Sequence, residues 1–194
     1  ALLKGVTVQH MEEVYTQRLQ LNPGAEALVK ACKAAGLKVL LVSGGFTFFS
    51  DRVRDTLGLD YTRRNVLEIA GERLTGRMVD QPWGDICDGA EKQRMLLETC
   101  AALGIEPAHA IAIGDGANDL PMLYAADVSV AWRAKPIVRT QATHAIDHGG
   151  LDAAERGERA RGDGEERIEE KRDHRGGAAD ALDADVAQPG EGDD

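Results

Sequence analysis

The hydrophobic and polar positions along the chain predict strands that alternate with helices. Residues 37–42 and 110–113 are short runs that are apolar on both faces, and residues 128–131 form a third. Such runs are typical of buried strands in a parallel sheet. Because helices are expected between them, the pattern predicts an α/β domain whose parallel sheet is covered on both faces.

The helices are indicated by apolar positions at helical spacing and by the turn residues that end them. A glycine or an Asn-Pro-Gly sequence follows most of them, as expected at helix C-termini. We expect helices at residues 1–20, 25–35, 46–57, 92–103 and 119–126, with a short one near Ile137. Residues 65–80 differ, because two strand-like segments flank Gly71-Glu72, and they predict a β-hairpin flap on the main sheet.

The composition changes after about Leu151. Residues 153–194 contain no aromatic side chain and only three large aliphatic ones, Ile168, Leu182 and Val186. A segment of Glu, Asp, Arg, Gly and Ala cannot bury enough apolar surface to offset the entropy of ordering. We therefore predict a disordered acidic tail, which fits a natural tail and a frame-shifted end of a GC-rich gene equally well.

Length, charge and cysteine usage limit the class of protein. The 194 residues suffice for one α/β domain, and the formal net charge of −10 disfavours binding to nucleic acids or to anionic membranes. No apolar stretch is long enough to span a bilayer, and the first residues lack the pattern of a secretory signal. The three cysteines show no CxxC spacing, so we expect reduced thiols in a cytoplasmic protein.

A first candidate site lies where the strand at residues 37–42 is expected to end. Ser43-Gly44-Gly45 turns the backbone there, and a helix is expected to begin at Phe46. Backbone N–H groups at a helix N-terminus bind anions, and the Ser43 hydroxyl could add a donor. The alternative, that Ser43 caps the helix and the glycines only permit the turn, has equal weight from these residues alone.

A second candidate site follows the strand at residues 110–113. Asp115 lies between Gly114 and Gly116 at the end of this strand, and Asn118 and Asp119 precede the next helix. Two carboxylates and an amide suit Mg²⁺, which prefers oxygen ligands. Helix capping could explain Asp119 and a turn could explain Asn118. A carboxylate between two glycines at the end of a strand, such as Asp115, has little structural role, so the pattern favours a functional role for this cluster.

Lys92 is the third candidate, because it falls in the first turn of its expected helix. The helix dipole disfavours a cation at that position, and a phosphate partner would explain it. The alternative is a solvated surface lysine, which is what single lysines usually are. The two other sites give weight to the phosphate interpretation.

Together, three motifs in this order resemble the haloacid-dehalogenase superfamily and, within it, the phosphoserine phosphatase family. They are Val-Ser-Gly-Gly-Phe at 42–46, the helix-start Lys92, and Gly-Asp-Gly-Ala-Asn-Asp-Leu-Pro-Met at 114–122. The last is the most specific. Shorter matches support them: Leu-Gly-Leu-Asp-Tyr at 57–61, Leu-Thr-Gly at 74–76 and Ala-Lys-Pro at 134–136. The resemblance covers residues 1 to about 152.

The resemblance implies a Rossmann-like core at residues 21–152, a remnant of a helical cap at 1–20, and the tail at 153–194. It also implies Mg²⁺-dependent hydrolysis of O-phospho-L-serine, a small phosphomonoester, through an aspartyl-phosphate, in serine biosynthesis. By motif position, Ser43, the Gly44 backbone and Asn118 would bind the phosphoryl group, while Lys92 would neutralise its charge.

For the metal, the resemblance implies that Asp115 holds Mg²⁺ and that Asp119 supports either the metal site or Lys92. One departure is large. Family members begin with a strand that ends in Asp-x-Asp-x-Thr/Ser, in which the first Asp is the nucleophile and the second the general acid–base. This motif occurs nowhere in the 194 residues. We therefore expect a chain truncated at its N-terminus, with a central strand and most of the cap missing and with no more than background activity.

Alternative functions remain open at this point. Another phosphatase or phosphotransferase of the superfamily, acting on a different small metabolite, fits the same residues, as does a non-catalytic fragment that binds phosphate and Mg²⁺. A phospho-receiver domain is disfavoured, because its acidic pair precedes its Ser/Thr and Lys. A dinucleotide-binding domain is disfavoured because residues 114–116 lack the third glycine of that motif.

Overall fold

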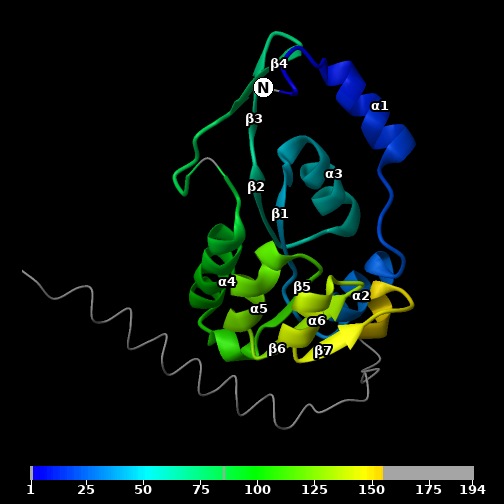
Figure 1. Ribbon diagram of the computed structural model, residues 1–194, viewed down its shortest axis with the longest axis vertical. Coiled ribbons are helices and arrows are strands. Elements are labelled where there is room, and N and C mark those ends of the chain that lie inside the picture. Colours follow the sequence, from blue (N-terminus) through cyan, green and yellow to red (C-terminus); the bar gives the residue numbers. More distant parts are fainter. Residues whose placement is uncertain (1, 85, 155–194) are drawn as a thin grey trace, which may run out of the picture. The chain divides into compact units, whose positions relative to one another are not determined.

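Strands and helices follow the order that the sequence predicts, with an additional strand at Tyr61–Asn65 (Figure 1). This computed structural model describes residues 2–84 and 86–154. Its longer elements are α1 (Val8–Arg18), α2 (Ala25–Ala34), β1 (Leu40–Phe46), α3 (Thr47–Leu57), β2 (Tyr61–Asn65), β3 (Leu67–Ala70), β4 (Arg73–Met78), α4 (Gly89–Leu103), β5 (Ile111–Gly114), α5 (Leu120–Ala125), β6 (Val128–Trp132), α6 (Pro136–Gln141) and β7 (His144–Ile146). Short 3₁₀ helices are η1 (Pro107–His109), η2 (Ala117–Asp119) and η3 (Leu151–Ala154).

The parallel strand pairing that the sequence predicts is confirmed. β1 pairs with β2 in parallel, β6 pairs in parallel with both β5 and β7, and β3 and β4 form the expected antiparallel hairpin. Within the described residues the parallel strands form two sheets rather than one, because no hydrogen bonds join β1 to β5. Ile111 on β5 is consequently 58% exposed, which is unusual for an aliphatic residue of a parallel strand.

β1 differs from its predicted bounds at both ends. The strand begins at Leu40 and continues through Ser43-Gly44-Gly45 to Phe46, where the sequence predicts a break. The pairing with β2 shifts register between Ser43 and Phe46, so the glycines form an irregularity inside a paired strand. The prediction that the strand ends at residue 42 is therefore wrong.

The predicted helix at residues 1–20 is shorter than expected, because its first residues pair with the hairpin. α1 begins at Val8, where the Thr7 hydroxyl accepts a hydrogen bond from the His10 backbone N–H at 3.1 Å. Before this cap, Gly5 N donates to Leu74 O at 2.9 Å and Leu74 N donates to Val6 O at 2.8 Å. Residues 5–8 are therefore fixed to β4 instead of extending the helix.

β6 is covered on both faces, as its apolar pattern predicts. One buried cluster lies between β5, β6 and the helices α4, α5 and α6, and its members are Leu96, Cys100, Ala112, Leu123, Ala126, Ala131, Val138 and Ala142. A second cluster lies on the other face of β6 and contains Val130, Trp132, Ile146 and Ala153. These clusters hold β5 and β6, and the loop that follows β5 carries Asp115, Asn118 and Asp119 of the candidate site.

The end of the described chain returns to the start of α2. Leu151 N donates to Pro23 O at 2.7 Å, and Ala153 in η3 is fully buried. Gly24, at a φ of 80°, lies so close to Asp152 that an added Cβ would overlap the Asp152 carboxylate. The tail predicted at 153–194 lies outside the described residues from 155 onward.

Candidate active site

The loop after β5 is closed around one buried carboxylate, that of Asp119. Its Oδ2 accepts hydrogen bonds from the backbone N–H groups of Asp115 and Gly116, both at 3.0 Å. Its Oδ1 lies 2.6 Å from Lys92 Nζ on α4. Lys92 is only 7% exposed and Asp119 only 6%, so this is a buried ion pair. The pair joins the start of α4 to the loop that carries Asp115.

The environment of Asp119 keeps its carboxylate charged. Burial acts to raise the pKa of Asp119, but the hydrogen bond from Lys92 and the N–H groups of Gly116 and Asp115 outweigh it, and the pKa is lowered. Lys92 is thus held by a permanent negative partner. The alternative of a solvated surface lysine is wrong, because this side chain is buried.

Lys92 also lies deeper in its helix than the sequence predicts. α4 begins at Gly89, three residues before the predicted start, because the Asp88 carboxylate accepts a hydrogen bond from Glu91 N at 2.9 Å and caps the helix. Lys92 is therefore the fourth residue of α4. From there its side chain reaches Asp119.

The glycines on either side of Asp115 make room for the loop's own side chains. A Cβ on Gly114 would lie 2.5 Å from the Asp119 Cβ and 2.9 Å from its Oδ2. A Cβ on Gly116 would lie 2.5 Å from Asn118 Oδ1. Both distances are far below van der Waals contact. At Gly114 the obstacle is the Cβ of the buried, hydrogen-bonded Asp119, so this position requires glycine, whereas at Gly116 it is the end of the exposed Asn118 side chain, which would have to rotate.

Asp115 and Asn118 lie at the exposed side of the same loop. The Asp115 carboxylate forms no hydrogen bond or ion pair with another described residue, while its backbone carbonyl accepts from Lys135 N at 3.1 Å. The described residues contain no cluster of three or more His, Cys, Asp or Glu side chains suited to a metal. One available carboxylate still fits Mg²⁺, which takes one or two protein carboxylates and completes its shell with water and phosphate oxygens.

Ser43 and Gly44 lie in the irregular part of β1. The Ser43 hydroxyl accepts a hydrogen bond from Gly45 N at 3.0 Å, and α3 begins at Thr47 without a side-chain cap. The helix-cap alternative for Ser43 is therefore wrong, because Phe46 is the N-cap residue of α3, whereas the Ser43 hydroxyl as a donor to an anion stays a prediction. Ser43 stabilises a turn inside the strand, and it is half-buried while Gly44 is exposed.

Asn65, at the end of β2, is a site residue that the sequence does not predict. Its side chain is buried, with Nδ2 donating to Gly44 O at 2.7 Å and Oδ1 accepting from Cys87 N at 2.6 Å. It thereby links the Ser43–Gly44 turn to the residues just before α4. Only the parallel pairing of β2 with β1 could reveal this, since the sequence around Asn65 has no motif of its own.

A further contact links α4 to the loop after β5. A Cβ on Gly89 would lie 2.8 Å from Asn118 O, so these two backbone segments are in close contact. With Asn65 and the Lys92–Asp119 pair, this contact brings the three predicted regions into one site.

Replacing Asn65 by leucine is expected to lower the free energy of unfolding by about 2 kcal/mol, because Gly44 O and the buried Cys87 N would lose their partners. Urea denaturation measures this change. Asn22, which is exposed, offers a matched control: N22L is expected to change stability by less than about 0.5 kcal/mol. Equal effects of the two substitutions would contradict a linking role for Asn65.

The comparison with known proteins decides the family. A model of the haloacid dehalogenase-like hydrolases matches residues 2–124. The chain belongs to the haloacid dehalogenase-like hydrolases, in the phosphoserine phosphatase family. It is 72% identical over 152 residues to a phosphoserine phosphatase of Polaromonas sp. and 68% identical over 152 residues to one of Albidiferax ferrireducens. Each alignment covers 78% of this chain and 64% of the relative, so the chain spans less than two thirds of these phosphatases.

Solved structures of the family confirm the fold. A phosphoserine phosphatase described as a phospho-aspartyl intermediate analogue matches with a TM-score of 0.74 and 32% identity, over 80% of this chain and 72% of that one. A probable phosphoserine phosphatase from Vibrio cholerae, in its unliganded form, matches with a TM-score of 0.73 and 38% identity, over 78% of this chain and 46% of that one. The predicted α/β architecture of this haloacid dehalogenase-like hydrolase is thus confirmed. Among the described residues, no helix combines the length and apolarity needed to cross a bilayer.

Proposed function

We propose that this chain forms the core of an enzyme that hydrolyses O-phospho-L-serine to L-serine and phosphate. The observation that carries the proposal is the buried Lys92–Asp119 pair, which fixes a cation beside the loop of Asp115. The relatives that are 72% and 68% identical bear the name phosphoserine phosphatase, and one related structure is described as substrate-bound. Serine as the product would place the enzyme in amino-acid biosynthesis in the cytoplasm.

In this proposal the phosphoryl group lies between four groups of the site. The Ser43 hydroxyl, the Gly44 backbone and the Asn118 amide donate hydrogen bonds to its oxygens, and Lys92 neutralises its charge. Asn65 keeps Gly44 at the start of α4, and the Gly89–Asn118 contact keeps the loop there too. Fixed donors and a fixed cation suit phosphoryl transfer, because its catalysis depends mainly on positioning and charge stabilisation.

We assign Asp115 as the Mg²⁺ ligand, since its carboxylate has no other described partner. The metal, when bound, supplies charge stabilisation at the phosphate oxygens. Asp119 is assigned to Lys92 rather than to the metal. Both of its oxygens already accept hydrogen bonds, one from Lys92 and the other from two backbone N–H groups.

An aspartyl-phosphate is the proposed intermediate, in keeping with the related structure described as its analogue. The nucleophile belongs to the Asp-x-Asp-x-Thr/Ser motif, which the 194 residues do not contain. An oxygen of its first aspartate attacks phosphorus, and the serine oxygen leaves with a proton from the second aspartate. Water then cleaves the acyl phosphate, regenerating the aspartate and releasing phosphate. The 194-residue polypeptide alone is therefore expected to be inactive.

The test compares this polypeptide with one preceded by the Asp-x-Asp-x-Thr segment of a close relative. We expect background release of serine from the first and Mg²⁺-dependent release from the second, measured with O-phosphoserine beside a panel of other phosphomonoesters. Asp115→Asn in the extended protein should reduce the rate about a hundredfold or more, within the range for loss of one charge-stabilising group.

Two outcomes would overturn parts of this proposal. Mg²⁺-dependent serine release from the 194 residues alone would contradict the assignment of the nucleophile. A folded extended protein that hydrolyses another phosphomonoester much faster than phosphoserine would contradict the substrate.

A further inference from the structure

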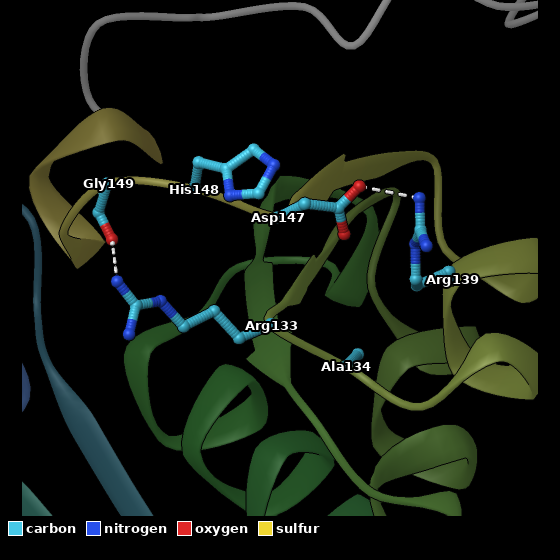
Figure 2. A pocket seen from close by; sticks show the side chains of 6 residues that line it. All are labelled: Arg133, Ala134, Arg139, Asp147, His148 and Gly149. Carbon is cyan, nitrogen blue, oxygen red and sulfur yellow. Dashed lines mark hydrogen bonds and ion pairs between the residues drawn. The ribbon is translucent and has the colours of Figure 1, made fainter.

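A polar cavity that is broadly open to solvent lies at the carboxyl ends of β6 and β7 (Figure 2). Its volume is about 660 Å³, within the range of small-molecule sites. Two short loops and one side chain of α6 form its lining, which comprises Arg133, Ala134, Arg139, Asp147, His148 and Gly149. None of these residues belongs to the proposed phosphatase site, so the cavity requires an explanation of its own.

Arg133 is held in this cavity at a cost to its backbone. Its φ of 47° is the one positive value among described residues other than glycine. A left-handed conformation is unfavourable for a residue with a Cβ, and glycine would avoid this cost. The backbone is fixed by a hydrogen bond from Arg133 N to Ile146 O at 2.8 Å. The position thus carries an arginine where its backbone favours glycine, which points to a use for the side chain.

The guanidinium of Arg133 is oriented but retains free donors. Its Nη2 donates to Gly149 O at 3.0 Å (Figure 2). Its Cζ lies 5.0 Å from the centre of the Trp132 ring. Arginine has five N–H donors, and this arrangement uses one of them. The others remain available at the edge of the cavity, because Arg133 is exposed.

The charge of the lining favours an anion. Arg139 Nη2 lies 2.5 Å from Asp147 Oδ2, so the carboxylate occupies one edge of the second guanidinium and leaves its other donors. The lining therefore contains two guanidinium groups and an imidazole but only one carboxylate, in a chain whose net charge is −10. Arginine groups bind planar carboxylates and tetrahedral phosphates through paired N–H donors.

We propose that this cavity binds a small oxyanion, either a carboxylate or a phosphate, between Arg133 and Arg139. The site shares a sheet edge with Asp115, since Lys135 N, two residues beyond Arg133, donates to Asp115 O. It differs from the proposed phosphatase site in every residue, so either can fail without the other.

The test titrates ¹⁵N-labelled protein with phosphate and, separately, with malonate at constant ionic strength. We expect saturable chemical-shift changes at the amides of residues 133–134 and 148–149 with at least one anion. A response to both anions, or to one, supports the site and identifies the preferred class. Changes restricted to residues 43–44 and 114–118 would report only the proposed phosphatase site and would overturn this proposal, as would no saturable change.

Two substitutions of opposite effect test the assignment of the arginines. Arg133→Gly relieves the backbone strain, so the variant should give the spectrum of a folded protein. Its affinity for the anion should fall about tenfold, because the charge-assisted hydrogen bonds of the arginine are lost. Asp147→Asn frees Arg139 and should strengthen binding severalfold. Arg77→Gln and Asp80→Asn change the charge at exposed positions of the hairpin region and should leave the affinity unchanged. Unaltered affinity in R133G would overturn the proposal.

Discussion

Replacing Lys92 by methionine is expected to lower the free energy of unfolding by about 3–5 kcal/mol, because the substitution leaves the Asp119 carboxylate buried without its cation. Methionine retains most of the apolar stem of lysine, so the loss reports the charge rather than the packing. Urea denaturation at pH 7 measures the change. The double variant Lys92→Met, Asp119→Asn is expected to be more stable than K92M, since it removes the isolated charge as well.

Lys38 provides the matched control for this prediction. It pairs with Asp60 at 2.9 Å, but its side chain is 53% exposed. Water screens such a pair, so Lys38→Met should reduce stability by a small fraction of the effect of K92M. Similar losses in the two variants would contradict the idea that Lys92 belongs to a buried pair that the fold requires.

The same pair has a consequence for acid stability. Because the pKa of Asp119 is lowered from 3.8 in the folded protein, its contribution to stability is present above that pH and is lost as the pH falls through the folded value. Removing Lys92 removes a main cause of the lowering. The difference in stability between the unsubstituted protein and K92M is therefore expected to shrink below pH 3.8.

Gly114→Ala is expected to cost about 3 kcal/mol, the upper part of the usual range for overpacking. The added methyl would lie 2.5 Å from the Asp119 Cβ and 2.8 Å from its Cγ. Asp119 cannot move aside without breaking its bonds to Lys92 and to two backbone N–H groups. Denaturation experiments measure the loss, and a crystal structure of the variant would show the displaced carboxylate.

Gly44→Ala serves as the control for this substitution. Gly44 also has a backbone conformation open to other residues, and the atom nearest to its added Cβ, Cys87 O, would lie at 3.5 Å, an ordinary contact. The free energy of unfolding of the G44A protein should differ from that of the unsubstituted protein by less than about 1 kcal/mol. A G114A protein as stable as G44A would mean that the loop after β5 can relax around the methyl group.

Hydrophobic patterning predicts the strands that are covered on both faces. It does not predict a strand that is polar and that forms only because it pairs with a neighbouring strand. Residues 128–131 are apolar except for Ser129, because helices cover one face of β6 and a second cluster covers the other. β2 escapes prediction because Thr62, Arg63 and Arg64 make it polar, although it pairs with β1 along its whole length. Its strand character depends on a partner that lies about twenty residues earlier in the chain.

Motifs predict the candidate site residues better than they predict how those residues are held. The loop at 114–119 and Lys92 are visible in the sequence, but their contact joins residues 27 positions apart. Burial of Lys92 depends on that contact, so a local pattern cannot distinguish it from a surface lysine. Asn65 escapes for the same reason, because its role consists of two bonds to backbone atoms about twenty residues away on either side.

The close approach of η3 to the start of α2 restricts how this sequence can diverge. Gly24 has no room for a side chain beside Asp152, and Pro23 supplies the carbonyl that holds Leu151. A mutation in either segment therefore changes which residues the other segment can accommodate, although about 130 positions separate the two. In a set of related sequences, positions 23–24 and 151–152 should change together. A chimaera that exchanges only one of the two segments should lose the fit between them.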